Sequence, residues 1–267
     1  MHGHTTQAAT LDHQLERWRS EIIAWRTPDE IVSRSAPHPV VGRRLPRNVG
    51  AVDPPPQGSR SYARAVEALP AGGSVLDVGA GAGGASLPLA ARLGLVVGVD
   101  TSAEQLAALE ARAGALGVRA QTVVGEWPAA ADLVEAADLV ICHHVLFSVA
   151  DLQPFIEALS ARSRRRVVVE IPMRHPEWPL NPLWLRFHGI ERPEGPTALD
   201  LAGVIELLGL RPQVETWVDV AGWGEYESFD DLVNRTRRKL RLSPVRTGEL
   251  AEALLQMGID PARLMSI

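Results

Sequence analysis

Residues 75–84 read Val-Leu-Asp-Val-Gly-Ala-Gly-Ala-Gly-Gly, an apolar run that passes directly into glycines. Glycine has no Cβ atom, so such a turn can adopt left-handed backbone conformations and let a ligand approach the main chain closely. A helical pattern follows at 85–93, and the N-terminus of a helix presents unpaired N–H groups. The stretch therefore predicts a strand, a tight turn and a helix, with a ligand at the turn. Taken alone, the glycines also fit a dinucleotide site or a turn that binds nothing.

From residue 74 onward, short β-branched runs alternate with helical patterns. This alternation is typical of a parallel sheet with crossover helices, so we predict a doubly wound, mostly parallel α/β fold. The expected strands are 74–78, 96–100, 120–124, 139–143, 167–171 and 213–220. The expected helices of this part are 85–93, 103–116, 151–160 and one capped by Thr197 and Asp200.

The two ends of the chain have a different texture. Residues 36–56 are rich in Pro, Arg and Gly and predict a lid, after which a short helix is expected at 61–69. Further helices are expected after Ser228 and from Thr247. Near the N-terminus, apolar residues recur at the spacing of one helix face: Leu11, Leu15, Trp18, Ile22 and Trp25.

We expect three segments: an N-terminal helix and lid at 1–70, a doubly wound domain at 71–220, and a C-terminal helical extension of that domain at 221–267. A closing strand of the sheet would have to come from 261–267. If that strand is absent, the expected sixth strand at 213–220 is an exposed edge, which favours pairing with a second copy. We therefore expect a homodimer or a covered edge.

The composition excludes several classes of protein. The formal net charge of -5 argues against a protein whose main task is to hold duplex nucleic acid, because that task needs a basic face. The single cysteine, Cys142, excludes an intrachain disulfide framework and a multi-cysteine zinc site. No apolar run reaches the roughly 18 residues of a membrane span, and the N-terminus lacks a signal-peptide core. We therefore expect a cytoplasmic protein that does not cross a membrane.

Two carboxylates flank the glycine turn. Asp77 lies two residues before Gly79, where it would repel a pyrophosphate but attract an ammonium group. Asp100 ends the next expected strand, where an acidic side chain can accept both hydroxyls of a ribose. The pair predicts a ligand with a ribose, a cationic tail and no phosphate, and S-adenosylmethionine has this outline. A nicotinamide oxidoreductase is disfavoured by Asp77, and because Tyr62 and Tyr226 have no lysine four residues on.

Four motifs resemble those of the class I S-adenosylmethionine-dependent methyltransferases, over roughly residues 70–172. They are Val75–Gly83, Val97–Asp100, Gly125–Trp127 and Asp138–Leu146. The resemblance implies a Rossmann-like sheet ordered 3-2-1-4-5-7-6, with S-adenosylmethionine and its acceptor at the C-terminal ends of the strands. It implies cofactor contacts from residues at the ends of the first four strands: Asp77, Gly79, Ala80, Gly81, Gly83, Asp100, Thr101, Gln105, Glu126, Trp127, Cys142 and His143.

Two of these positions carry alternatives. Glu126 stands where the family commonly has an aspartate beside the glycine, so its contact with the adenine amine is less well supported than that of Asp100 with the ribose. Trp127 either covers the adenine face or belongs to the hydrophobic core.

Methyl transfer from a sulfonium mainly requires alignment of the acceptor with the methyl carbon, so catalytic residues are weakly encoded in such a sequence. His143 and His144 end the fourth expected strand, and a histidine can act as a base toward a hydroxyl or an amine. Successive strand residues point to opposite faces, so we expect only one of them, with His144 favoured, to face the active site. The alternative is that one packs beneath the cofactor and the other lies in the core.

The segment after the fifth expected strand mixes aromatic and ionisable side chains. Such a mixture suits a partly apolar acceptor with a polar tip, although a surface loop held by tryptophans is the alternative. The candidate acceptor residues are Glu170, Arg174, His175, Trp178, Trp184 and His188. The histidines and Glu170 match no familiar zinc spacing, so no metal is expected.

The acceptor itself is weakly specified. No Asn/Asp-Pro-Pro-Tyr/Phe motif of the nucleobase amine methyltransferases follows the fourth strand. We predict methyl transfer to a hydroxyl or amine of a small molecule. One alternative is a cofactor-binding module without turnover. The other is an RNA or protein methyltransferase that uses the basic helix residues Arg235, Arg237, Arg238, Lys239 and Arg241.

Overall fold

The computed structural model describes residues 2–34, 58–218 and 226–261. The chain forms two compact units. The first, here called the sheet unit, comprises Met1–Ile23, Arg43–His175 and Gly195–Val218, and the second, the helical unit, comprises Ala24–Gly42, Pro176–Glu194 and Asp219–Ile267. These boundaries differ from the expected three segments, because the N-terminal helix joins the sheet unit and the segment after the fifth strand contributes to the helical unit.

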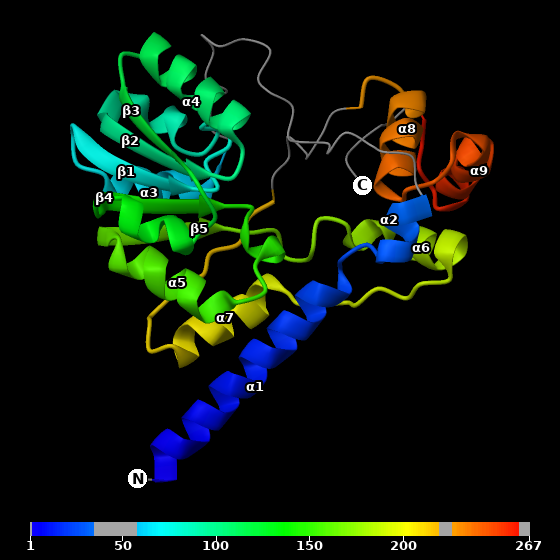
Figure 1. The fold of residues 1–267 in the computed structure, drawn as a ribbon, viewed down its shortest axis with the longest axis horizontal. Helices are drawn as coiled ribbons and strands as arrows, with labels where there is room; N and C mark the ends of the chain where they lie inside the picture. The colour runs from blue at the N-terminus through cyan, green and yellow to red at the C-terminus, as the bar shows by residue number, and fades with distance from the viewer. Residues whose placement is uncertain (1, 35–57, 219–225, 262–267) are drawn as a thin grey trace. The chain divides into compact units, whose positions relative to one another are not determined.

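The sheet unit is built on five parallel strands in the order β3-β2-β1-β4-β5 (Figure 1). The doubly wound α/β fold is thereby confirmed. The chain order reverses between β1 and β4, and ligands of such sheets bind at this switch point, beyond the C-terminal strand ends. The strands are β1 Gly73–Val78, β2 Leu93–Asp100, β3 Arg119–Val124, β4 Ala137–His143 and β5 Ser163–Glu170.

Helices connect these strands at nearly the expected places. One difference is that the connection from β1 to β2 is a short 3-10 helix, since only a few residues separate the glycine turn from the start of β2. The α-helices of this unit are α1 His2–Ala24, α3 Arg60–Ala68, α4 Ala103–Ala115, α5 Leu152–Ala161 and α7 Ala198–Leu207. The 3-10 helices are η1 Leu87–Arg92, η2 Ala129–Leu133 and η3 Leu146–Ser148.

Each face of the sheet carries its own hydrophobic core, because successive strand residues point to opposite faces. On β1, Val75 packs in the core formed with α3, α4 and η1, whereas Leu76 packs in the core formed with α1, α5 and α7. Both cores consist mainly of fully buried Leu, Val and Ile side chains. Hydrophobic cores therefore pack against both faces of the sheet.

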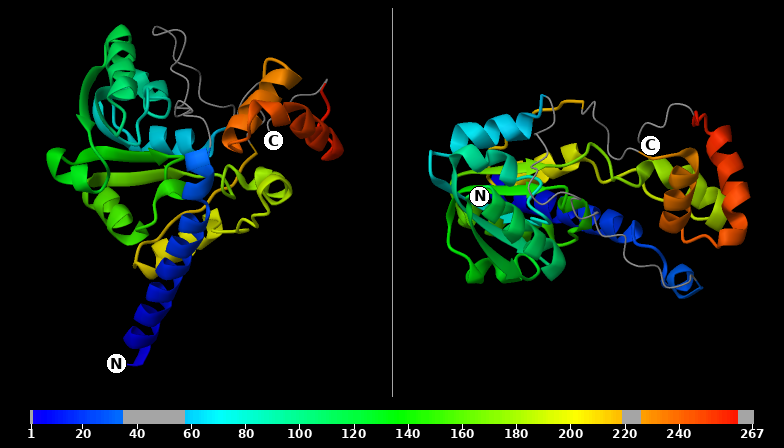
Figure 2. Two further views of the ribbon diagram at one scale, coloured as in Figure 1. Left: turned by 45° about the vertical axis from the view of Figure 1, so that its right-hand side comes forward. Right: turned by 90° about the horizontal axis from the view of Figure 1, so that it is seen from above.

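The N-terminal helix packs where its apolar stripe predicts. Trp18 of α1 is buried, its indole N–H donates to the carbonyl of Val149 at 2.8 Å, and its ring stacks on Phe147. Arg17 also pairs with Asp200 of α7 at 3.5 Å, so α1 and α7 lie next to each other (Figure 2). Thr197 and Asp200 form the expected capping box at the start of α7. The N-terminal helix α1 is thus part of the sheet unit.

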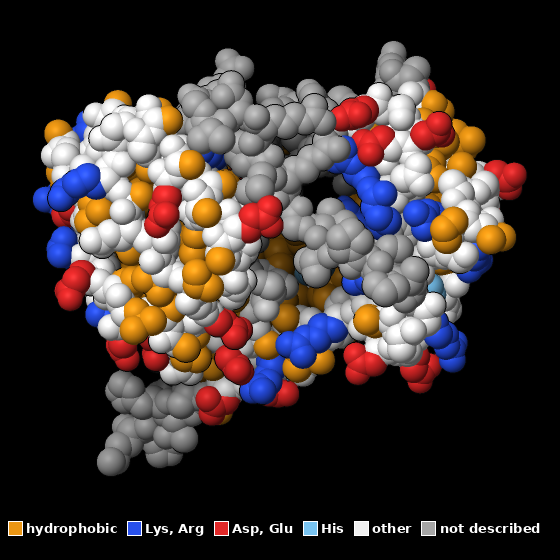
Figure 3. Space-filling model, turned by 45° about the horizontal axis from the view of Figure 1, so that its top comes forward, with side chains coloured by type: hydrophobic (Ala, Val, Ile, Leu, Met, Phe, Trp, Pro, Cys, Tyr) orange, Lys and Arg blue, Asp and Glu red, His pale blue; other side chains and the backbone are white. Residues whose placement is uncertain are grey.

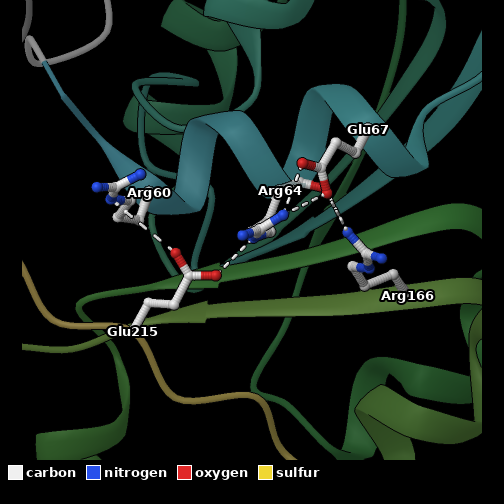
Figure 4. Close-up of polar contacts among 5 residues, drawn as sticks. All are labelled: Arg60, Arg64, Glu67, Arg166 and Glu215. Carbon is white, nitrogen blue, oxygen red and sulfur yellow. Dashed lines mark hydrogen bonds and ion pairs between the residues drawn. The ribbon is translucent and has the colours of Figure 1, made fainter.

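The expected sixth strand is wrong for residues 213–218, which the structure describes without any strand pairing. The alternating apolar residues of this segment are not buried, since Val214 and Val218 are 55% and 82% exposed. Charge holds the segment instead: Glu215 accepts from Arg64 of α3 at 2.6 Å and lies 4.0 Å from Arg60 (Figure 4). Residues 219–220 lie outside the described part.

The same ion-pair cluster ties α3 to the last strand of the sheet. Arg64 also donates to Glu67, and Glu67 accepts from Arg166 of β5 at 3.2 Å (Figure 4). The two carboxylates raise the pKa of the Arg64 guanidinium, with Glu67 as the larger cause. These exposed pairs link α3 to β5, while Ala65 of α3 packs in the hydrophobic core beneath it.

The helical unit has a core of its own. Its elements are α2 Asp29–Arg34, η4 Trp178–Leu180, α6 Asn181–His188, α8 Phe229–Lys239, η5 Pro244–Arg246 and α9 Thr247–Gln256. The predicted cap at Ser228 and the predicted helix from Thr247 are confirmed. The buried guanidinium of Arg192 lies 3.7 Å from the ring of Trp184 and donates to the carbonyl of Trp25 at 2.9 Å.

Two expectations fall on other parts of the chain. The lid at 36–56 and residues 262–267 of the closing strand lie outside the described residues. Within the described parts, no helix combines the length and apolar character that a membrane crossing requires.

Candidate functional site

The glycine turn follows β1 and has the conformation that its composition predicts. Gly79, Gly81 and Gly83 adopt φ angles of +74°, +50° and +79°, a region that side chains with a Cβ rarely enter. At Gly79 a Cβ would lie 2.3 Å from Cγ2 of Val145, so the turn and the end of β4 approach each other too closely for any larger residue. Glycine at position 79 is therefore required by the close approach of Val145 to the turn at the C-terminal end of β1.

Asp100 connects this turn to the end of β2. Its Oδ2 accepts the N–H of Gly81 at 2.8 Å, and its Oδ1 accepts the N–H of Ser102 at 2.8 Å. A carboxylate has about four lone-pair positions, so each oxygen can accept a further hydrogen bond. The half-buried carboxylate is thereby oriented beside the turn, in the place where a ribose would donate its two hydroxyls.

Asp77 and Cys142 lie deeper. Asp77 is 1% exposed on β1 and is paired in register with Ile141 of β4. Burial raises the pKa of the Cys142 thiol, and the Asp77 carboxylate raises it further, so the thiol stays protonated. Ala80 is buried as well, and its N–H and that of Gly79 both donate to the carbonyl of Val99.

The start of α4 borders the turn from the other side. Ser102 caps α4 by accepting the N–H of Gln105, as its sequence predicts, while Thr101 is exposed. Oε1 of Gln105 lies 3.8 Å from the position that a Cβ on Gly81 would occupy. Gln105 therefore lies near Gly81, and the cofactor contacts of Thr101 and Gln105 stay predictions.

One residue near the turn was not expected from the sequence. Arg112 of α4 is buried, and its Nη1 donates to the carbonyl of Ala82 at 2.6 Å. The position lies on the apolar stripe of α4, and a single arginine there carries no signal that distinguishes it from a surface residue. Arg112 thus stabilises the glycine turn through its hydrogen bond to the carbonyl of Ala82.

Glu126 and Trp127 occupy different surroundings. Glu126 is exposed, whereas Trp127 lies in the hydrophobic core and its indole N–H donates to the carbonyl of Phe155 at 3.2 Å. The structure thus places Trp127 among core residues, and its contact with an adenine stays a prediction.

The residues present fit S-adenosylmethionine. At Gly81 a Cβ would come no closer than 3.8 Å to another side chain, so the turn is open there. An oriented carboxylate ends β2, and a second carboxylate lies at the C-terminal end of β1. In a doubly wound sheet of this order, ligands lie beyond the C-terminal strand ends, and two carboxylates there suit a ribose and an ammonium group better than a pyrophosphate.

Comparison with known proteins points to the same kind of domain. The sequence profile of a methyltransferase domain matches residues 75–165. Residues 75–165 are therefore similar to a methyltransferase domain, and the site residues described above fit S-adenosylmethionine as its cofactor. A search of curated proteins finds no match.

Several solved structures are similar to the chain. Magnesium protoporphyrin IX methyltransferase from Synechocystis shares 20% identity over 55% of this chain and 67% of its own, with a TM-score of 0.44. A SAM-dependent methyltransferase from Aquifex aeolicus shares 17% over 73% of this chain and 94% of its own, with a TM-score of 0.43. A precorrin 8W decarboxylase from Methanobacterium thermoautotrophicum shares 20% over 43% of this chain, with a TM-score of 0.36. The chain spans 64% of the length of that last protein.

Two histidines and a glutamate, His143, His144 and Glu170, meet at the ends of β4 and β5, next to Val145, which packs against the glycine turn. Nε2 of His144 lies 2.9 Å from Oε1 of Glu170, and Nδ1 of His143 lies 3.8 Å from its Oε2. His143 pairs with Glu170 in the strand register, and the N–H of His144 donates to the carbonyl of Glu170 at 2.8 Å. All three side chains are mostly buried.

Both histidines contact the same carboxylate, and the expectation that only one of them faces the active site stays a prediction. His144 comes after the end of β4 and has a φ of +61°, so it does not continue the alternation of the strand. A left-handed histidine is uncommon, and such conformations gather at functional sites. The turn of the backbone brings the His144 ring to the same side as His143.

Ser61 completes this cluster from α3. Its hydroxyl donates to Oε2 of Glu170 in a short hydrogen bond. Burial raises the pKa of Glu170, but the hydrogen bonds from His144 and Ser61 and the nearby charge of His143 outweigh it and lower the pKa to about 2. Glu170 is therefore a carboxylate throughout the physiological range of pH.

This shift predicts an acid-dependent stability. A carboxyl whose pKa is lower in the folded protein stabilises the fold above its unfolded pKa of about 4.3 and loses that contribution as the pH falls toward 2. We expect the difference in free energy of unfolding between wild type and Glu170→Gln to shrink by roughly 2 kcal/mol from about pH 5 to about pH 2, allowing for solvent screening. Urea titrations at several pH values would measure it, and a difference that stays constant would contradict the assignment.

The other candidate acceptor residues separate into the two units. In the sheet unit, the ring of His175 packs against Phe147 at 5.5 Å, and Arg174 forms a bridge with Thr197. In the helical unit, Trp184 is fully buried, so it cannot line an open pocket.

The remaining two residues of the helical unit have hydrogen bonds inside that unit. Trp178 donates to Glu194 at 2.8 Å, and His188 is 2.7 Å from the carbonyl of Leu240. These contacts resemble the alternative of a loop held by tryptophans. In the described residues, no group of three or more His, Cys, Asp or Glu side chains is arranged to hold a metal ion.

Proposed function

We propose that the protein transfers a methyl group from S-adenosylmethionine to a hydroxyl or amine of a small molecule, with His144 as the general base. The observation that carries this proposal is the hydrogen bond of 2.9 Å between His144 and Glu170, next to the glycine turn. An ionised carboxylate that holds one ring nitrogen of a histidine is the usual way to orient the other nitrogen toward an acidic proton.

The chain's own groups then divide the work as follows. Glu170 accepts the Nε2–H of His144, which selects the tautomer in which Nδ1 carries the lone pair. The His144 imidazole takes the proton that the acceptor hydroxyl or ammonium group loses. When bound, S-adenosylmethionine would supply the methyl group, with its sulfonium sulfur as the leaving group. Glu170 stabilises the imidazolium that results.

The charges of the protein favour a small acceptor over RNA. In the basic helix, Arg235 pairs with Asp231 at 2.7 Å and Arg237 donates to the carbonyl of Leu242 at 2.9 Å, so these two side chains are engaged within the helical unit. Acidic and basic side chains are interspersed over the visible face of the sheet unit (Figure 3). Together with the net charge of -5, these features offer little of the continuous basic surface that RNA requires.

The test is a screen of small hydroxyl and amine compounds for methyl transfer, followed by His144→Gln. We expect this variant to lower kcat about a hundredfold, the usual contribution of a general base, while the affinity for S-adenosylhomocysteine stays unchanged. His13→Gln, at an exposed position on α1, is the matched control and should retain full activity. Full activity of the His144 variant would exclude the base.

The same experiments separate the alternatives. Salt-sensitive binding of RNA that is lost on neutralising Arg237 and Arg238 would support an RNA acceptor instead. Tight binding of S-adenosylmethionine without turnover across the screen would support a binding module.

Localisation and assembly are further parts of the proposal. We propose a cytoplasmic protein, since its one cysteine, Cys142, is a buried free thiol that suits a reducing compartment. The proposed homodimer now involves the outer edge of β5, the last strand of the described sheet, in place of the expected sixth strand. Light scattering that finds only a monomer would exclude it.

A further inference from the structure

The cluster around Glu170 continues into the N-terminus of α3, a helix that the proposed mechanism does not use. Ser59 is the N-cap of α3, and its Oγ accepts the N–H of Tyr62 at 3.2 Å. The hydroxyls of Ser59 and Ser61 are 3.0 Å apart. Both serines are buried, although serine is mostly an exposed residue.

The hydrogen bonds of this cluster can run in only one direction. A hydroxyl has a single hydrogen, and that of Ser61 is donated to Glu170. The hydrogen between the two serines must therefore come from Ser59, whose oxygen already accepts the N–H of Tyr62. The result is a chain of donors that starts at the backbone of α3 and ends on the carboxylate.

Such a chain strengthens each of its members, since every hydrogen bond polarises the next. Its last acceptor, Glu170, is held at both oxygens: Ser61 binds Oε2, and His144 binds Oε1. A carboxylate held at only one oxygen can rotate, whereas two donors from different elements leave it one orientation. The ion pairs of Arg64, Glu67 and Arg166 also link α3 to β5.

We propose that Ser61 is a positioning residue of the methyltransferase, which fixes the Glu170 carboxylate so that His144 is held in its Nε2–H tautomer. This inference rests on the proposed function, because it assigns Ser61 a part in preparing the base. Ser61 acts on the base only through Glu170, and Ser59 supports it from the helix cap.

Nitrogen-15 NMR of the His144 ring tests the proposal without an acceptor. In the wild type we expect the Nε2–H tautomer to dominate. In Ser61→Ala we expect the Nδ1–H form to increase about fivefold relative to it, as when one hydrogen bond of ordinary strength no longer orients the carboxylate. The pKa of the Glu170 carboxyl should rise toward its ordinary value in the same variant, because Ser61 is one of the three groups that lower it, with His144 and His143.

Three further variants distinguish orientation from helix stability. Ser61→Thr keeps the hydroxyl and should restore the wild-type tautomer ratio, while Ser59→Ala should change it in the same direction as Ser61→Ala but less. Ser20→Ala, at an exposed serine of α1, should change nothing. Affinity for S-adenosylhomocysteine, measured by calorimetry, should stay within about twofold in all four variants, which would show that the cofactor site is intact.

The outcomes separate this inference from the proposed function. An unchanged tautomer ratio and an unchanged Glu170 pKa in Ser61→Ala would overturn the role of Ser61, whatever the enzyme methylates. A changed ratio combined with full activity of His144→Gln would leave the orientation in place and overturn the base instead.

Discussion

Replacing Asp100 with alanine is expected to weaken the binding of S-adenosylhomocysteine about a hundredfold. The side chain ends β2, and its two oxygens are already oriented by the N–H groups of Gly81 and Ser102. Two ribose hydroxyls bound to a charged acceptor contribute about 3 kcal/mol together, which corresponds to about two powers of ten in affinity. Isothermal titration calorimetry would measure the loss directly.

The matched control is Asp132→Ala, because the Asp132 side chain is 95% exposed and pairs only at the surface with Arg162. It should bind the cofactor product as tightly as the wild type. Asp100→Asn keeps one carbonyl oxygen and should fall between the two. Equal affinity of wild type and Asp100→Ala would show that Asp100 serves only to brace the turn.

The second large effect is expected at Gly79. Gly79→Ala should destabilise the fold by about 3 kcal/mol, from the strain of a left-handed alanine and the clash of its Cβ with Val145. The affinity for S-adenosylhomocysteine should fall with it, since the turn has to move to relieve the clash. Urea unfolding followed by circular dichroism would measure the loss of stability.

Gly84→Ala is the control within the same turn. A Cβ at this position meets no heavy atom within 4 Å, and no left-handed φ is required there. We expect a change within about 0.5 kcal/mol, as for an ordinary surface substitution. If both variants were equally destabilised, the close approach of the turn to Val145 would not be the reason for glycine at position 79.

Much of the cofactor side of the site follows from the sequence because its signals are local. The glycines, Asp77 and Asp100 all lie within one strand-turn-helix-strand unit, whose geometry depends on residues near them in the chain. The cap at Ser102 and the capping box of Thr197 and Asp200 are local in the same sense, since each joins residues three positions apart.

Some expectations failed where distant contacts compete with a local pattern. Residues 213–218 alternate like a strand, yet their one strong attachment is Glu215, which meets arginines on α3. Alternation alone cannot report whether a neighbouring strand offers an apolar face or charges. The segment after β5 likewise resembled one substrate loop, but Pro176–Glu194 belongs to the helical unit and contributes Trp184 to its core.

The sequence by itself determined the doubly wound fold, the glycine turn and the carboxylates that identify S-adenosylmethionine, because strand period, glycine and caps act over a few residues. Only the tertiary structure decided how the candidate base is built. It brought His144 against Glu170 through a left-handed backbone, and it added Ser61 from a helix that lies 109 positions earlier in the chain than Glu170. Such contacts depend on how strands pair and where a helix packs, and no local pattern records that.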